Sequence, residues 1–323
     1  MRAKIIAAIA LAAIGVAGAP GAASAQSGII RIIIPFAPAG SADVLARMLQ
    51  QPLQEELKQT IIVENRAGAA SNIGTSEVAR ARPDGLTLLL TTSAFVVNPA
   101  LYKNVPYDFA KDFAPIGLLP IAPNVFAVNP KQDGIKSLAD LIARAKGDPQ
   151  KLNYSSPGNG TTPQLTMELF KLKTGAGITN IPYNGGGPAT QALMSGTVDV
   201  LSTALPGAQA QIRAGTMKGI ALTTSERWPT LPDVPTFKEL GYPDIDLNTE
   251  HFLLAPAATP PAIIERLSKA ALAVMARDDV KKRVVELGFL PVANGPDAAK
   301  ARIAKDVAFY TDLIAKAKIP QIQ

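Results

Sequence analysis

The chain has 323 residues, 47% of them apolar and 18% charged, which suffices for one large hydrophobic core or two smaller ones; at this length two domains is the better expectation. It contains no cysteine and one histidine, His251, which excludes disulfide scaffolds, thiolate zinc sites, cysteine nucleophiles and multi-histidine metal sites. The net charge of +6 comes without a basic run interleaved with aromatic residues, so we expect no nucleic-acid binding, whereas a mild positive field suits small anions.

Residues 1–25 predict a signal peptide. A basic start at Arg2 and Lys4 is followed by an apolar stretch, and residues 23–25 (Ala-Ser-Ala) form a small-x-small cleavage site that leaves Gln26 as the first mature residue. The alternative is an N-terminal membrane anchor, but the apolar stretch is short for a span of about 20 residues. The pattern therefore predicts export to a bacterial periplasm.

After this segment, strand-like runs alternate with helix-like runs, which is the order of an α/β fold. Several of the strand-like runs are apolar throughout, as is typical of strands buried on both faces of a parallel sheet. The predicted strands are residues 29–36, 60–65, 86–92, 124–129, 152–156, 178–183, 198–204, 218–224 and 251–255.

Helix signals lie between these strands. Residues 41–57 carry apolar side chains at helical spacing, and Pro52 is expected to kink or split this helix. Ser137, with Asp140, resembles a capping box. Other helices are expected to begin at Thr162-Pro163, Gly187-Pro188 and Thr259-Pro260, to stop at Gly288, and to span residues 296–317 at the C-terminus.

Four loops that lead from a strand toward a helix share a composition. They are residues 35–41, 91–94, 155–162 and 183–187; all are rich in small residues and none contains Lys or Arg. Small residues let a ligand approach the backbone, and the unpaired N–H groups and positive dipole at a helix N-terminus attract an anion without a basic side chain. In an open α/β sheet such loops lie at the carboxyl ends of the strands, where ligands bind.

The loops therefore predict a cleft that grips a small carboxylate with backbone amides and hydroxyl groups. An equally simple interpretation of any single loop is an ordinary turn in which Gly and Ser satisfy helix ends. A phosphate-binding loop is excluded at 155–162 because no Gly-Lys-Ser/Thr follows, and a dinucleotide fingerprint is absent. The predicted ligand-binding residues are Phe36, Ala39, Gly40, Ser41, Asp43, Ser93, Ser155, Ser156, Gly160, Thr161, Thr162, Tyr183, Asn184 and Gly185. We expect no catalytic residue, no metal and no cofactor.

An ordered series of short motifs runs through the mature chain. It comprises IPF at 34–36, VENRAG at 63–68, NIG at 72–74, RPDG at 82–85, NPALY at 98–102, KDFAP at 111–115, NYSS at 153–156, IPY at 181–183 and LPDVPT at 231–236. Any one of them is weak, but the series resembles the Bug (TctC-type) family, the extracytoplasmic solute receptors of tripartite tricarboxylate transporters.

The resemblance implies a two-lobed, type II periplasmic-binding-protein (Venus-flytrap) fold. Lobe 1 would comprise residues 26–124 and 249–323, and lobe 2 residues 125–248. It also implies a monomer that is not an enzyme and that delivers a small carboxylate (a dicarboxylate, an amino acid or an aromatic acid) to membrane permease subunits. A receptor that feeds a two-component sensor kinase is the first alternative, because it would use the same lobe closure. An exported serine hydrolase is the second, although no Gly-x-Ser-x-Gly motif is present and a triad would have to use His251.

The chain departs from the family pattern at three places. Ala39 stands where the family has the first glycine of a Pro-Gly-Gly loop, Pro163-Gln164 follow the glycine-threonine turn where a histidine is common, and Glu250-His251-Phe252 replace a Trp-aromatic-Gly run. We expect His251 to be a packed hinge residue without evident partners, Glu250 to face solvent, and Asp43 to stabilise the first turn of its helix rather than to bind ligand.

Overall fold

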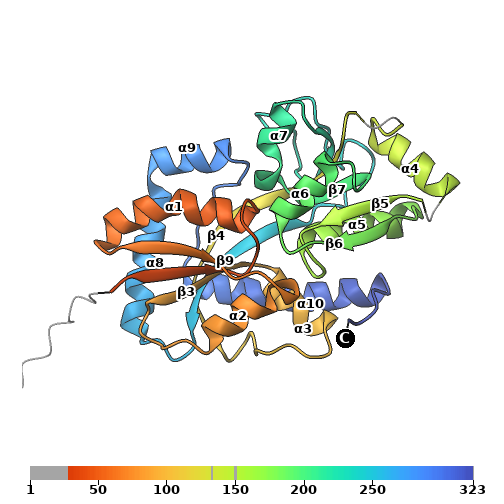
Figure 1. The fold of residues 1–323 in the computed structure, drawn as a ribbon. Helices are drawn as coiled ribbons and strands as arrows, with labels where there is room; N and C mark the ends of the chain where they lie inside the picture. Colours follow the sequence, from red (N-terminus) through yellow and green to blue (C-terminus); the bar gives the residue numbers. More distant parts are fainter. Residues whose placement is uncertain (1–27, 132–133, 149–150, 323) are drawn as a thin grey trace, which may run out of the picture.

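The structure is a computed structural model that describes residues 28–131, 134–148 and 151–322. The predicted signal peptide lies outside the described residues. Strands and helices alternate as the sequence predicts (Figure 1). The strands are β1 (Ile30–Ile34), β2 (Ile61–Asn65), β3 (Thr87–Thr92), β4 (Phe113–Val128), β5 (Asn153–Ser156), β6 (Thr179–Pro182), β7 (Val200–Ala204), β8 (Lys218–Leu222) and β9 (Asn248–Pro256).

Ten α-helices and two short 3-10 helices accompany these strands in the described residues. The α-helices are α1 (Ser41–Leu57), α2 (Asn72–Ala79), α3 (Ala94–Leu101), α4 (Leu138–Gly147), α5 (Thr162–Thr174), α6 (Gly186–Met194), α7 (Gln209–Arg213), α8 (Pro261–Ala276), α9 (Asp278–Glu286) and α10 (Pro296–Lys316), and the 3-10 helices are η1 (Ala69–Ser71) and η2 (Leu205–Gly207). Across this part of the chain, no helix has the length and apolarity that crossing a membrane requires.

Two long antiparallel strands, β4 and β9, join the halves of the molecule. The sheet order is β2-β1-β3-β9-β4-β7-β5-β6, with β8 also paired to β4. Residues 113–123 of β4 pair with β9, and from Asn124 onward β4 pairs with β7 and β8 instead. Figure 1 shows α1, α2 and α8 on one side of this junction and α4 to α7 on the other. The lobe boundaries near residues 124 and 249 stay a prediction from the sequence, and Asn124 is the residue at which β4 changes partners.

Each lobe has a core of its own, and a third cluster joins them. In lobe 1, Leu45, Leu49 and Leu53 of α1 pack in one cluster with residues of the strands and of α8. In lobe 2, Trp228 packs among its own lobe's residues, as predicted. The third cluster, on the other face of the sheet, includes residues of both lobes and of α10. Because side chains of β4 and β9 pack in the cluster that both lobes share, these two strands can act as a hinge and keep their packing.

Two elements differ from the prediction. Pro52 does not split helix α1, which runs through it from Ser41 to Leu57, because its buried leucines anchor both of its halves to the core. Strand β4 starts eleven residues before the predicted 124–129 strand, at Phe113. Three prolines, Pro115, Pro120 and Pro123, hide this part of β4 from a sequence-based reading, since proline cannot donate to a sheet ladder. The strand shifts register against β9 at Pro115 and Pro120, and Pro123 precedes the change of partners at Asn124.

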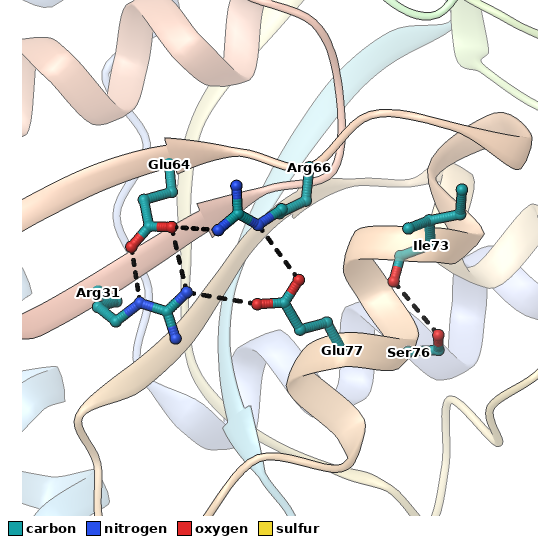
Figure 2. A network of polar contacts seen from close by, with 6 residues as sticks. All are labelled: Arg31, Glu64, Arg66, Ile73, Ser76 and Glu77. Atoms are coloured by element: carbon teal, nitrogen blue, oxygen red, sulfur yellow. Dashed lines mark hydrogen bonds and ion pairs between the residues drawn. The ribbon is translucent and has the colours of Figure 1, made fainter.

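A ring of alternating charges holds the edge of lobe 1 together (Figure 2). Arg31 and Arg66 each contact both Glu64 and Glu77, with nitrogen–oxygen distances from 2.6 to 3.4 Å, and so connect β1, β2 and α2. The hydrogen bond from Arg31 is the main cause that lowers the pKa of Glu64. Next to this ring, Asn65 donates a hydrogen bond to the Phe36 carbonyl oxygen at 3.0 Å. The VENRAG motif thus supports the first loop from behind.

Candidate functional site

A cavity lies between the two lobes and against the hinge strands. It encloses about 360 Å³ of space free of protein atoms, part of which is open to solvent. None of the side chains that line it carries a charge. The lining residues are Phe36, Gly40, Ser41, Ala42 and Thr92 from lobe 1, Pro157, Thr161, Pro163, Gly186, Thr203 and Ala204 from lobe 2, and Thr249 from β9.

Three helix N-termini contribute to this cavity. Helix α1 begins at its wall with Gly40 and Ser41, helix α5 with Thr161, and helix α6 with Gly186. At none of these three starts does a side chain cap the first amides. Uncapped amides at a helix start carry a partial positive charge. The cavity can therefore attract a carboxylate although it has no arginine or lysine.

The first loop is held in a strained conformation by a buried carboxylate. Ala39 adopts a left-handed backbone with φ of 66°, the position where the family pattern has glycine. Its amide donates to Asp43 at 3.0 Å, and the other oxygen of Asp43 accepts from Arg47 and Asn65, each at 3.0 Å. Asp43 is thus occupied with the loop and does not line the cavity, in line with the structural role that we favour from the sequence.

The structure brings four of the predicted binding residues to the cavity wall, and the other ten do not line it. Phe36, Gly40, Ser41 and Thr161 line the cavity. Most of the hydroxyl groups behind it bond to protein atoms. Ser93 donates to Glu250, Ser155 to the Ala189 carbonyl oxygen, Ser156 to Asn180, and Thr162 bonds the Thr249 hydroxyl.

The remaining predicted residues position the loops. Gly160 has φ of +77° and packs against Asn98, and Tyr183 is half-buried against the core of lobe 2. Asn184 is exposed, and its carbonyl oxygen accepts from the Ala37 amide at 2.7 Å, a hydrogen bond between the lobes. Gly185 is buried against Ala37. The lobes are therefore in contact at the rim of the cavity.

Sequence reasoning missed eight lining residues. Some of them, such as Thr92, Pro157 and Gly186, lie in the loops that it identified. Others, Thr203, Ala204 and Thr249, lie within strands β7 and β9, and only the approach of the two lobes brings them to one cavity. A loop-based search has no signal for such residues.

Ser41 and His251 form a hydrogen-bonded pair at the wall of the cavity. The Nε2 atom of His251 lies 2.9 Å from the Ser41 Oγ, and its Nδ1 lies 2.7 Å from the Pro120 carbonyl oxygen. The ring is fully buried and packs edge-on against Phe289. Burial lowers the pKa of His251 to about 4, opposed by the Pro120 hydrogen bond. The prediction of a packed histidine is confirmed, and the expectation that it lacks partners is wrong.

Glu250 is buried rather than solvent-facing, which corrects the prediction from the sequence. Its side chain is 1% exposed and forms an ion pair with Arg302 of α10. Ser93 also donates to it, at 3.2 Å. Adjacent residues of a strand face opposite sides of the sheet, so Glu250 points to α10 while His251 points to α1. The partner that compensates the buried charge comes from a helix 52 residues further along the chain, beyond the reach of a local pattern.

Comparison with known proteins identifies the family. The model of the "Tripartite tricarboxylate transporter family receptor" (TctC) matches residues 45–319. Protein BugT of Bordetella pertussis is 35% identical over 306 residues, which cover 94% of each chain.

Two solved structures are similar over nearly their whole length. Rpa4515 of R. palustris, solved with adipate, is 31% identical with a TM-score of 0.87 and covers 91% of this chain and 98% of its own. MatC from Rhodopseudomonas palustris, solved with bound malate, is 29% identical with a TM-score of 0.83, covering 88% and 98%. With its two lobes, its hinge strands and its uncharged interlobe cavity, this chain belongs to the Bug/TctC family of tripartite tricarboxylate transporter receptors, which are solute-binding proteins.

Proposed function

We propose that this chain is a periplasmic receptor that captures a small dicarboxylate between its lobes and presents the closed form to the permease subunits of a tripartite tricarboxylate-type transporter. The observation that carries the proposal is the meeting of three uncapped helix N-termini at a cavity without charged side chains. Two separated acid groups can each face a helix start of a different lobe. The adipate and malate that two similar proteins hold are acids of this kind.

Isothermal titration calorimetry with diacids and their diamides tests the proposal. Succinate and adipate should bind with one site per chain, whereas succinamide and adipamide, which have the same shape without the charge, should not. Equal affinity for acid and amide would show that the cleft does not recognise the negative charge.

A variant locates the site. A bulky side chain at Gly40 would meet the Gly186 amide nitrogen, 3.2 Å from an added β-carbon, so Gly40→Leu should abolish binding while the fold survives. Gly147→Leu is the matched control, because an added β-carbon there meets no atom within 4 Å. Unchanged binding in Gly40→Leu would place the ligand elsewhere.

One contact favours a second function, an exported serine hydrolase. Ser41 and His251 have the geometry of a nucleophile and its base. With a pKa of about 4, however, His251 is a poor base near neutral pH, and a main-chain carbonyl takes the place of the usual orienting carboxylate. Turnover of nitrophenyl esters that disappears in Ser41→Ala would support the hydrolase; stoichiometric binding without turnover supports the receptor.

A receptor whose closed form is recognised by a sensor kinase instead of a permease would give the same binding and turnover results.

A further inference from the structure

The hydroxyl groups at the cavity wall differ in what they can offer a ligand. Five hydroxyl-bearing side chains line the cavity: Ser41, Thr92, Thr161, Thr203 and Thr249. A hydroxyl group has one hydrogen to donate and two lone pairs that accept. Whenever its hydrogen is taken by an acceptor of the protein, the group can only accept from a ligand.

The hydrogen of Ser41 is directed away from the ligand by His251. The Pro120 carbonyl oxygen can only accept, so the Nδ1 atom of His251 carries the proton. Burial keeps the ring neutral, which leaves Nε2 as an acceptor. The Ser41 hydroxyl must therefore donate to Nε2, and its lone pairs remain for the cavity.

The hydroxyl groups of Thr249 and Thr161 also donate their hydrogen to an atom of the protein. Asn124 turns its Nδ2 toward the Leu247 carbonyl oxygen at 2.9 Å, so its Oδ1 accepts from the Thr249 hydroxyl at 2.8 Å. Thr162 then donates to the Thr249 oxygen, which keeps one lone pair for the cavity. Thr161 donates to the Gly158 carbonyl oxygen at 2.7 Å. Three of the five hydroxyl groups thus present acceptors to the cavity.

The other two hydroxyl groups keep a hydrogen available. The Thr203 hydroxyl has no hydrogen-bond partner in the part of the chain that the structure describes, and the Thr92 hydroxyl oxygen only accepts there, from the Ala94 amide. These two hydrogens, together with the helix-start amides, suit the oxygens of a carboxylate. The three acceptors suit a donor, so a guest that is only an acceptor would leave them unsatisfied.

The charge of the cavity decides which donor fits. No acidic side chain lines it, and three helix starts turn their positive ends toward it, so an ammonium group is disfavoured. A neutral hydroxyl group donates a hydrogen bond without that cost. The wall is therefore complementary to a molecule that combines a carboxylate with a hydroxyl.

We propose that the cleft selects hydroxycarboxylates, and that His251 is the positioning residue for this selectivity because it holds Ser41 as a hydrogen-bond acceptor. The inference rests on the proposed function and specifies the class of solute that the same site takes. It assigns Ser41 a role opposite to the carboxylate donor that the sequence predicts.

Matched pairs of acids test the proposal by calorimetry. The pairs are succinate and malate (both enantiomers), glutarate and 2-hydroxyglutarate, adipate and 2-hydroxyadipate, and phenylacetate and mandelate, with aspartate as the ammonium analogue of malate. In at least one pair the hydroxy acid should bind about tenfold or more tightly than its parent. Aspartate should bind more weakly than malate. Equal or tighter binding of every parent acid would overturn the inference and leave the carboxylate receptor in place, whereas an absence of binding to every acid would overturn both.

Two variants test whether the selectivity depends on the hydrogen bond between Ser41 and His251. In His251→Phe a ring is kept and the Ser41 hydroxyl hydrogen becomes available to the cavity. The ratio of the affinities for the hydroxy acid and its parent acid should therefore fall toward one. Ser41→Ala removes the acceptor and should reduce the preference in the same way, which keeps the test open if the first variant fails to fold. Thr203→Val is the control: it removes a donor to the carboxylate and should weaken both members of a pair equally, with their ratio unchanged. A ratio that survives in both His251→Phe and Ser41→Ala would contradict the proposal.

Discussion

Burial sets the charge of His251. Its ring has no exposed surface, contacts the ring of Phe289 edge-on at 5.5 Å between centroids, and holds a pKa of about 4 against its ordinary value of 6.5. Water that would stabilise the imidazolium is excluded, and the Pro120 carbonyl oxygen compensates only part of that loss. At neutral pH the ring is therefore neutral, which the assignment of Ser41 requires.

This low pKa predicts a loss of stability in acid. When the chain unfolds, His251 returns to its ordinary pKa, so between pH 6.5 and 4 the unfolded state binds a proton that the folded state does not. Its contribution is fully present above pH 6.5 and decreases by about 3 kcal/mol as the pH falls to 4. Urea unfolding of the wild type and of His251→Phe at pH 7, 5.5 and 4 measures it. The wild type should lose about 3 kcal/mol more than the variant; parallel losses would contradict the buried neutral ring.

The sequence indicates which loops reach the cavity more reliably than how their side chains are hydrogen-bonded. Small-residue loops without basic side chains led to Phe36, Gly40, Ser41 and Thr161 at the cavity wall. The direction of each hydroxyl group depends on partners far along the chain, such as His251, which is 210 residues from Ser41. A local pattern records no such partner, so the acceptor role of Ser41 follows only from the folded arrangement.

At the scale of elements, proline separates what was predictable from what was not. At the helix starts its effect is local: α5 begins at Thr162 with Pro163 in its first turn, as predicted, because a helix start needs no amide from the proline. Within β4 and α1 its effect depends on packing. Pro115 and Pro120 of β4 fall where the strand shifts register, and Pro52 stays helical between buried leucines. Tertiary packing outweighs the local preference in both elements.

Replacing Pro52 should stabilise the protein. Its ring nitrogen has no hydrogen, so the Met48 carbonyl oxygen lacks its helical partner one turn earlier. Pro52→Ala restores that hydrogen bond and should raise the free energy of unfolding by about 1–3 kcal/mol in urea titrations. Glu56→Ala, at an exposed position of the same helix, controls for alanine propensity and should change stability by less than about 0.5 kcal/mol. A destabilised Pro52→Ala would show that packing of the proline ring matters more than the missing bond.

At the scale of the whole molecule, closure depends on glycines where the lobes meet. The start of α6 in lobe 2 lies against the first loop of lobe 1, and a β-carbon at Gly187 would overlap the Pro38 carbonyl oxygen. The contact exists only when the lobes are together. In the proposed binding cycle, a change at this point acts on the equilibrium between the open and the closed form and leaves the interior of each lobe intact.

Gly187→Ala should hold the lobes apart. Alanine suits a helix better than glycine, so the melting temperature without ligand should change little. Ligand affinity should fall about tenfold or more, because closure then costs free energy, and small-angle scattering with ligand should show a more open particle than the wild type. The matched control, Gly147→Ala, meets no neighbouring atom and should bind normally. Wild-type affinity in Gly187→Ala would mean that ligand binding does not need this contact.

The use of main-chain amides at the cavity has an evolutionary consequence. An arginine that binds an acid can be lost by one codon change, whereas the amide at a helix start persists through nearly every substitution except proline. Mutational drift can thus exchange the hydroxyl groups and the residues behind them, position 251 among them, without abolishing the proposed affinity for acids. After gene duplication, copies of such a receptor can diverge toward different metabolites from a scaffold that already holds an anion.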